Sequence, residues 1–176
     1  MKPSEALKKC GSDKVMGYPS GHWYGQFYDE LFAPFREPIN ILEVGVLGGA
    51  SLRAWRMAFP DSKITGIDVI DVSLPKEFGI TLIKDDIKNV TLTEKYDVII
   101  DDSSHDLKES LYEIQHFCKN LTDKGVMVIE DIQIPDLYMS EMLKVLPEGF
   151  ILQGHDFRPM FGGQKHDDFI VKITRA

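Results

Sequence analysis

The residues best suited to chemistry stand in two short acidic segments. Asp101-Asp102-Ser103-Ser104-His105 follows the apolar run YDVII, and Glu130-Asp131 follows the apolar run GVMVI. If both runs are parallel strands of one sheet, the two segments meet at the same edge. Hard oxygen ligands from separate elements suit Mg²⁺, and clustered carboxylates repel one another unless a cation or a proton joins them. We therefore expect Asp102, Glu130 and Asp131 to hold Mg²⁺.

His105 is the expected general base beside that metal, because an imidazole can take up a proton near neutral pH. Ser104 is not expected to be a nucleophile, since adjacent residues rarely place a hydroxyl against the neighbouring ring and no G-x-S-x-G elbow exists. No pair of histidines or cysteines nearby favours zinc. The alternative is that these acids only anchor strand ends or cap the helix that follows residue 106.

A second group of residues surrounds the glycine-rich run EVGVLGGAS at positions 43–51. Such a turn between a strand and a helix lets a ligand approach the backbone at a helix N-terminus, although strand-helix packing alone could also require it. Asp68 ends the next apolar run, where a carboxylate can accept both hydrogens of a ribose diol. Asp86 follows the third run and could accept from an adenine amino group, or it could be a solvated loop carboxylate.

The elements that must position these residues alternate between strand and helix. That alternation predicts βαβ units in a parallel sheet, while the last two strands are too close in sequence for a crossover helix and should pair antiparallel. We expect an α/β, doubly wound, mostly parallel Rossmann-like seven-stranded sheet with a C-terminal antiparallel hairpin. The expected strands are 39–46, 63–70, 80–85, 96–102, 125–131, 150–157 and 167–175, and the expected helices are 50–59, 106–121 and 138–146.

The chain has 176 residues, which suits one domain. We expect a helical preface over 1–38 and a Rossmann-like core over 39–176. Residues 11–28 should fold over a bound cofactor as a lid and supply part of the acceptor pocket, because a site open to water is poor for the chemistry expected below. The likeliest contributors within that segment are His22, Tyr24 and Tyr28, with core packing as the alternative for the two tyrosines.

Composition excludes several kinds of partner. There are 28 Asp and Glu against 20 Lys and Arg, a net charge of −8, which argues against a nucleic-acid partner. Two widely spaced cysteines, Cys10 and Cys118, favour a reducing compartment. No apolar run is long enough for a membrane span or a signal peptide. We expect a cytoplasmic protein without nucleic-acid or membrane partners, and homo-oligomerisation stays open.

The sequence resembles the class I S-adenosylmethionine-dependent methyltransferases in Glu43-x-Gly45-x-x-x-Gly49, in Asp68 and in the terminal hairpin. Leu47 stands where that family usually has its second glycine. The resemblance implies that Gly45 and Gly49 line the methionine portion of the donor and that Asp68 holds its ribose. The full set of expected cofactor-binding residues is Glu43, Gly45, Gly49, Ser51, Asp68, Asp86 and Asp101.

The pattern DDSSH followed by a helix and then VIEDIQ resembles the metal-dependent sugar O-methyltransferases of antibiotic biosynthesis. These are the mycinamicin, macrocin and rhamnosyl enzymes, near the cephalosporin-hydroxylase-like group. GSDK at 11–14 and SLRAWRMAFP at 51–60 are similar to the same branch. The resemblance implies the same three Mg²⁺ ligands and His105 as base. Ser103 replaces the usual glycine, and the connection after the fifth strand is shorter than the lid common in that branch.

The expected function is therefore S-adenosylmethionine- and Mg²⁺-dependent O-methylation of a hydroxyl on a sugar or glycoside small molecule. Four alternatives stay open from the residues alone: a phenol or catechol acceptor, an NAD-dependent oxidoreductase, a metal-dependent hydrolase and a non-catalytic binding module. An oxidoreductase would share the glycine turn and Asp68, but it would not need the three later carboxylates together.

Overall fold

The structure is a computed structural model that describes residues 1–16, 21–36, 38–161 and 166–176. The predicted seven-stranded sheet is confirmed, with strand order β3-β2-β1-β4-β5-β7-β6. The strands are β1 (Asn40–Val44), β2 (Lys63–Asp68), β3 (Thr81–Lys84), β4 (Tyr96–Asp101), β5 (Leu121–Ile129), β6 (Phe150–Asp156) and β7 (Phe169–Arg175).

The sheet is doubly wound about β1. β1 pairs in parallel with β2 on one side and with β4 on the other, so the strand order reverses there. β7 lies antiparallel between β5 and β6, which confirms the predicted C-terminal hairpin. In a sheet of this kind, ligands bind at the carboxyl ends of the strands beside the reversal.

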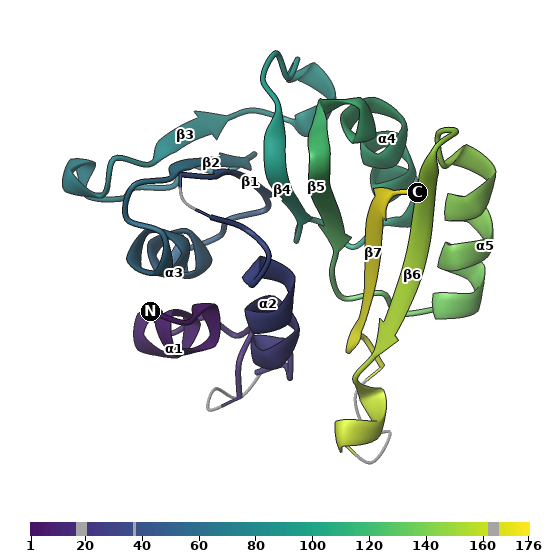
Figure 1. The fold of residues 1–176 in the computed structure, drawn as a ribbon, viewed down its shortest axis with the longest axis horizontal. Coiled ribbons are helices and arrows are strands. Elements are labelled where there is room, and N and C mark those ends of the chain that lie inside the picture. The colour runs from purple at the N-terminus through teal and green to yellow at the C-terminus, as the bar shows by residue number, and fades with distance from the viewer. Residues whose placement is uncertain (17–20, 37, 162–165) are drawn as a thin grey trace.

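Helices cover both faces of the sheet (Figure 1). On one face lie α1 (Pro3–Cys10), α2 (Gly25–Phe32) and α3 (Ala50–Ala58), and on the other lie α4 (Leu107–Phe117) and α5 (Pro135–Val145). In β1, successive residues belong to the two cores alternately, so Ile41 packs with the first group of helices and Leu42 with the second. Trp55 is fully buried in the first core, against the ring of Phe32.

Several predicted boundaries differ from those of the structure. The helix expected over 106–121 ends at Phe117, and a 3-10 turn leads into β5 four residues earlier than expected. The Asn120 side chain explains this, because its amide donates to the carbonyl oxygens of Leu92 at 3.0 Å and Glu94 at 2.8 Å and so directs the chain into the sheet. The helix expected to begin at 138 begins at Pro135, a favoured first helical residue.

Among the described helices, none has the length and apolar character that crossing a bilayer requires.

The loop after β1 has little space around Gly45. This residue has φ +78°, and a Cβ atom there would lie 2.0 Å from the carbonyl oxygen of Asp102. The Gly45 amide donates to Ile67 at 2.9 Å, and the Asp102 amide donates to Val44 at 2.9 Å. The loops that follow β1 and β4 therefore touch, which only glycine permits at this position.

We expect Gly45→Ala to lower the free energy of unfolding by roughly 2–4 kcal/mol, since it adds a backbone clash to a left-handed conformation. Gly48→Ala, in the same loop, is the control, because a Cβ there meets nothing within 4 Å. Urea unfolding of both variants measures the difference. Equal stability of the two variants would contradict the proposed close approach of the two loops.

Candidate functional site

A cavity of about 850 Å³ opens at the carboxyl ends of the parallel strands. One wall comes from the ends of β2 and β3 and includes Asp68 and Asp86. A second comes from residues 10–14, the glycine-rich loop and the start of α3. The third follows β4 and β5 and includes Asp102, His105 and Asp131. Members of both groups of residues singled out in the sequence thus share one cavity.

Asp68 shapes the glycine-rich loop from the opposite wall. Its Oδ2 accepts hydrogen bonds from the amides of Val46 at 2.8 Å and Leu47 at 2.9 Å, and its Oδ1 accepts from Ile70 at 3.0 Å. Burial alone would raise the pKa of Asp68, but these amide hydrogen bonds outweigh it and lower the pKa. Asp68 is therefore a carboxylate at neutral pH that also lines the cavity.

The remaining predicted cofactor residues divide into two groups. Gly45, Ser51 and Asp86 line the cavity. Glu43, Gly49 and Asp101 are not among the described residues that line it. Glu43 is fully buried within β1 and accepts from the Trp55 indole at 2.6 Å.

Asp101 and Gly49 have structural surroundings of their own. Asp101 accepts from the hydroxyls of Ser103 at 2.6 Å and Ser110 at 3.1 Å, and so fixes the turn after β4 to α4. Gly49 has φ +69° and lies against Leu74, so it serves the turn into α3.

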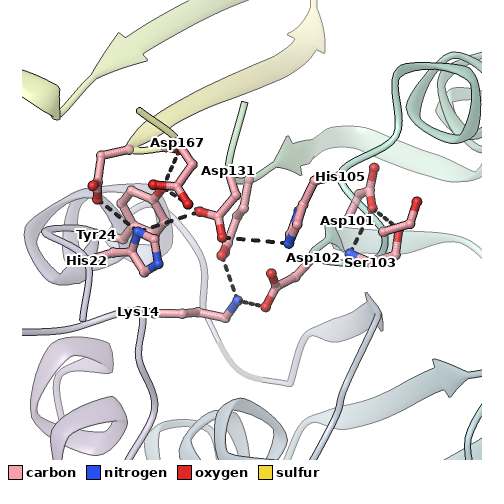
Figure 2. A network of polar contacts seen from close by, with 12 residues as sticks. Lys14, His22, Tyr24, Asp101, Asp102, Ser103, His105, Asp131 and Asp167 are labelled. Carbon is pink, nitrogen blue, oxygen red and sulfur yellow. Dashed lines mark hydrogen bonds and ion pairs between the residues drawn. The ribbon is translucent and has the colours of Figure 1, made fainter. Parts of the chain in front are cut away.

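The acidic edge contains a cation that the sequence analysis missed. Lys14 is 1% exposed, and its ammonium lies 2.7 Å from Glu130 Oε2, 3.6 Å from Glu43 Oε1 and in an ion pair with Asp102 (Figure 2). Burial alone would lower the pKa of Lys14, but the three carboxylates outweigh it and hold the pKa well above its usual value. The repulsion expected among the acids is therefore already relieved in part by the protein itself.

Glu130 lies deeper than predicted. One carboxylate oxygen contacts Lys14, and the other accepts a hydrogen bond from the Tyr28 hydroxyl. Burial is the main cause that raises the pKa of Glu130, with Asp102 and Asp131 adding to it and Lys14 opposing it. Ligand atoms of Asp102, His105 and Asp131, by contrast, all lie within 4.8 Å of one another. Two of the three predicted metal ligands, Asp102 and Asp131, thus converge with the predicted base. Glu130 is buried and is not part of this group.

Asp131 is held from several sides (Figure 2). The Tyr24 hydroxyl donates to its Oδ1 at 2.6 Å, and His22 Nδ1 lies 3.6 Å from the same oxygen. His105 Nε2 lies 3.8 Å from Oδ2. His22 also contacts the fully buried Asp168 at 2.8 Å. The carboxylate that faces the cavity is therefore oriented by side chains from the N-terminal segment.

Only part of the segment expected to form a lid, residues 11–28, reaches the cavity in the described structure. Within 11–28, the described residues that line the cavity are 11–14. Tyr24 and Tyr28 are fully buried, contact Asp131 and Glu130 from the interior and are not among the described residues that line the cavity. Residues 17–20, which also belong to the expected lid, lie outside the described residues.

Backbone strain gathers at this cavity. The described non-glycine residues with positive φ are Leu47 at 44°, His105 at 56° and Asp131 at 55°, and all three line it. They follow β1, β4 and β5 respectively. Such conformations are costly for residues with a side chain and concentrate at functional sites. At His105 the Tyr138 hydroxyl helps to hold the turn by donating to the backbone carbonyl at 2.7 Å.

Comparison with known proteins gives related sequences and a related fold. No protein-family model matches the chain. It is 30% identical over 126 residues to mycinamicin VI 2''-O-methyltransferase of Micromonospora griseorubida, which covers 63% of this chain and 32% of that protein. It is 30% identical over 127 residues to the 8-demethyl-8-alpha-L-rhamnosyl tetracenomycin-C 2'-O-methyltransferase of Streptomyces olivaceus, covering 64% and 34%. The chain thus spans about a third of the length of these curated relatives.

Among solved structures, MycE methyltransferase from the mycinamycin biosynthetic pathway, in complex with Mg and S-adenosylhomocysteine, matches with a TM-score of 0.77 at 23% identity. The match covers 100% of this chain and 55% of that one. The chain therefore has the Rossmann-like methyltransferase fold, and over almost two thirds of its length its sequence is similar to the sugar O-methyltransferases.

Proposed function

We propose that this chain is an S-adenosylmethionine- and Mg²⁺-dependent O-methyltransferase that acts on a hydroxyl of a sugar or glycoside. The observation that carries the proposal is the shared cavity. A glycine-rich loop fixed by Asp68 forms one side, and the convergent Asp102, His105 and Asp131 form another.

The donor side has the features that a nucleoside needs. Asp68 keeps lone pairs for a ribose diol while it fixes the loop, since each carboxylate oxygen can accept more than one hydrogen bond. Asp86 lies on the same wall and accepts from the Lys88 amide at 2.9 Å, which fixes its direction. Gly45 and Ser51 line the cavity near the start of α3, where backbone amides can meet a ligand.

The metal side fits a hard divalent cation. Asp102 and Asp131 offer carboxylate oxygens within 4.8 Å of one another and of a His105 nitrogen, and Mg²⁺ usually takes one or two protein carboxylates together with waters and substrate oxygens. Glu130, the third predicted ligand, is not part of this group, and its two carboxylate oxygens contact Lys14 and Tyr28. When bound, the cation supplies a Lewis acid that lowers the pKa of a coordinated hydroxyl.

His105 is proposed to accept the proton of the acceptor hydroxyl at Nε2. This nitrogen faces Asp131 at 3.8 Å, and the side chain is partly open to the cavity, at 29% exposure. A positive φ turns the residue toward the cavity, and Tyr138 stabilises that turn. Holding the acceptor in line with the donor can contribute several of the roughly 7–11 kcal/mol available from proximity and orientation.

We also propose that the protein works in a reducing, cytoplasmic environment on a small molecule rather than on nucleic acid. Both cysteines are free thiols, and the chain carries a net charge of −8. A sugar or glycoside acceptor is supported by the names of the relatives described above.

The proposed function is tested by methyl transfer from tritiated S-adenosylmethionine to a panel of methyl glycosides that includes methyl rhamnoside. We expect EDTA to abolish transfer and Mg²⁺ to restore it, while binding of S-adenosylhomocysteine survives EDTA because the donor side uses other residues. His105→Asn should lower the rate on the order of 10²–10⁴-fold, since it removes a positioned base yet tolerates the left-handed backbone.

The matched control is His116→Ala, which changes an exposed histidine on α4 that is not among the described residues lining the cavity. Its rate should stay near that of the unmodified protein. Metal-independent transfer, or an equal loss in both histidine variants, would contradict the assigned roles.

Lys14→Met should lower the free energy of unfolding by about 3–5 kcal/mol, because it leaves Glu43 and Glu130 buried without their counter-charge. Burial already raises the pKa of both carboxyls, and the loss of Lys14 removes an opposing cause. The folded variant then binds more protons than the unfolded chain, so its deficit should shrink as the pH falls from about 8 to about 5.

Urea unfolding across this pH range is the measurement. Lys88→Met, which removes an exposed lysine from its contact with Glu109 at 2.7 Å, is the control and should change stability little at any pH. A pH-independent deficit in Lys14→Met would show that the ammonium does not neutralise these acids.

A further inference from the structure

The proposed donor is a sulfonium with three arms, and the cavity has three walls. The adenosyl arm belongs with Asp68 and Asp86, and the methyl group must face the acceptor side at Asp102, His105 and Asp131. The amino acid arm is left with the remaining wall, which consists of residues 10–14, the glycine-rich loop and the first turn of α3. That wall must accommodate a carboxylate.

An anion has few places to bind in this cavity, because most of the charged lining residues are acidic. The cations in the described lining are Lys14 and Arg53. Lys14 is buried and already in contact with three carboxylates. Arg53 lies in α3, on the same wall as the glycine-rich loop, and it is the lining residue that can offer a positive charge to the amino acid arm.

The contacts of Arg53 leave its charge available. Its Nη1 donates to the Gly48 carbonyl at 2.9 Å and its Nη2 to the Cys10 carbonyl at 3.5 Å. The acceptor in both hydrogen bonds is a neutral carbonyl oxygen. They fix the guanidinium between the glycine-rich loop and the end of α1 without neutralising it, and a guanidinium has five N–H donors in all.

The position of Arg53 in α3 is unfavourable without an anion. The first turn of α3 contains no acidic residue, and Gly49 provides no side-chain cap for the helix N-terminus. The positive end of the helix dipole therefore lies next to a positive side chain, an arrangement that costs stability. A bound carboxylate would compensate both charges at once.

We propose that Arg53 binds the carboxylate of the donor's amino acid arm, and this inference rests on the proposed function. The guanidinium donates to the carboxylate with the N–H groups that its two carbonyl contacts leave over, and the amides of the first turn of α3 add to the binding. The same contacts place residues 10–14 against the donor, because the Cys10 carbonyl is held by the same side chain.

Calorimetry with two ligands tests this assignment. S-adenosylhomocysteine carries the carboxylate, whereas 5′-deoxy-5′-(3-aminopropylthio)adenosine keeps the amine and lacks the carboxylate. Arg53→Met should weaken the binding of S-adenosylhomocysteine about 10- to 100-fold, as expected for the loss of a charge-assisted hydrogen bond. It should weaken the binding of the second ligand by less than about 3-fold. Arg53→Lys, which keeps the charge but not the planar fork, should fall between.

Asp68→Asn is the contrasting variant. It changes the proposed contact with the ribose, which both ligands carry, and should weaken the binding of both by the same factor. Equal losses of both ligands in Arg53→Met, or no loss of either, would overturn the assignment and leave Arg53 as a support for the loop. Failure of the unmodified protein to bind S-adenosylhomocysteine would instead contradict the proposed function itself. Circular dichroism confirms that each variant is folded.

Discussion

The arrangement of this site depends on one buried ammonium group. Lys14 lies among the carboxylates of Glu43, Asp102 and Glu130. Burial raises the pKa of the two glutamate carboxyls, and the Lys14 ammonium opposes that effect. The lysine belongs to the N-terminal segment, whereas the acids belong to the sheet and the loops after it. The interaction therefore fixes the N-terminal segment to the carboxyl edge of the sheet, and it supports our proposal that residues 1–176 form a single domain.

Around this ion cluster, the strand ends carry the strained backbone that aims the functional groups. Leu47, His105 and Asp131 adopt positive φ at the turns after β1, β4 and β5. Hydrogen bonds compensate that cost: Asp68 holds the Leu47 amide, Tyr138 holds the His105 carbonyl, and Tyr24 holds the Asp131 side chain. These hydrogen bonds thus stabilise the turns after the strands, and the groups that face the cavity stay available for a ligand.

The sequence allowed the sheet, the hairpin and the convergence of Asp102, His105 and Asp131 to be predicted, because apolar runs followed by acids are local patterns. It did not reveal the role of Lys14, since a lysine in a polar segment usually lies in solvent, and its burial depends on contacts 88 and 116 residues away. The same limit explains Glu43 and Asp101. Each stands beside a motif in the sequence, but its side chain points into the interior of the protein. That direction depends on the position of the residue in the assembled sheet.

The central claim is that one cavity holds the donor and a divalent cation side by side. A crystal structure of the protein with S-adenosylhomocysteine and Mn²⁺, with the metal located by anomalous scattering, tests this most directly. We predict one manganese peak in bonding contact with the carboxylates of Asp102 and Asp131, near His105, with the ribose hydroxyls at Asp68. A manganese ion bound elsewhere, or S-adenosylhomocysteine outside this cavity, would contradict the account.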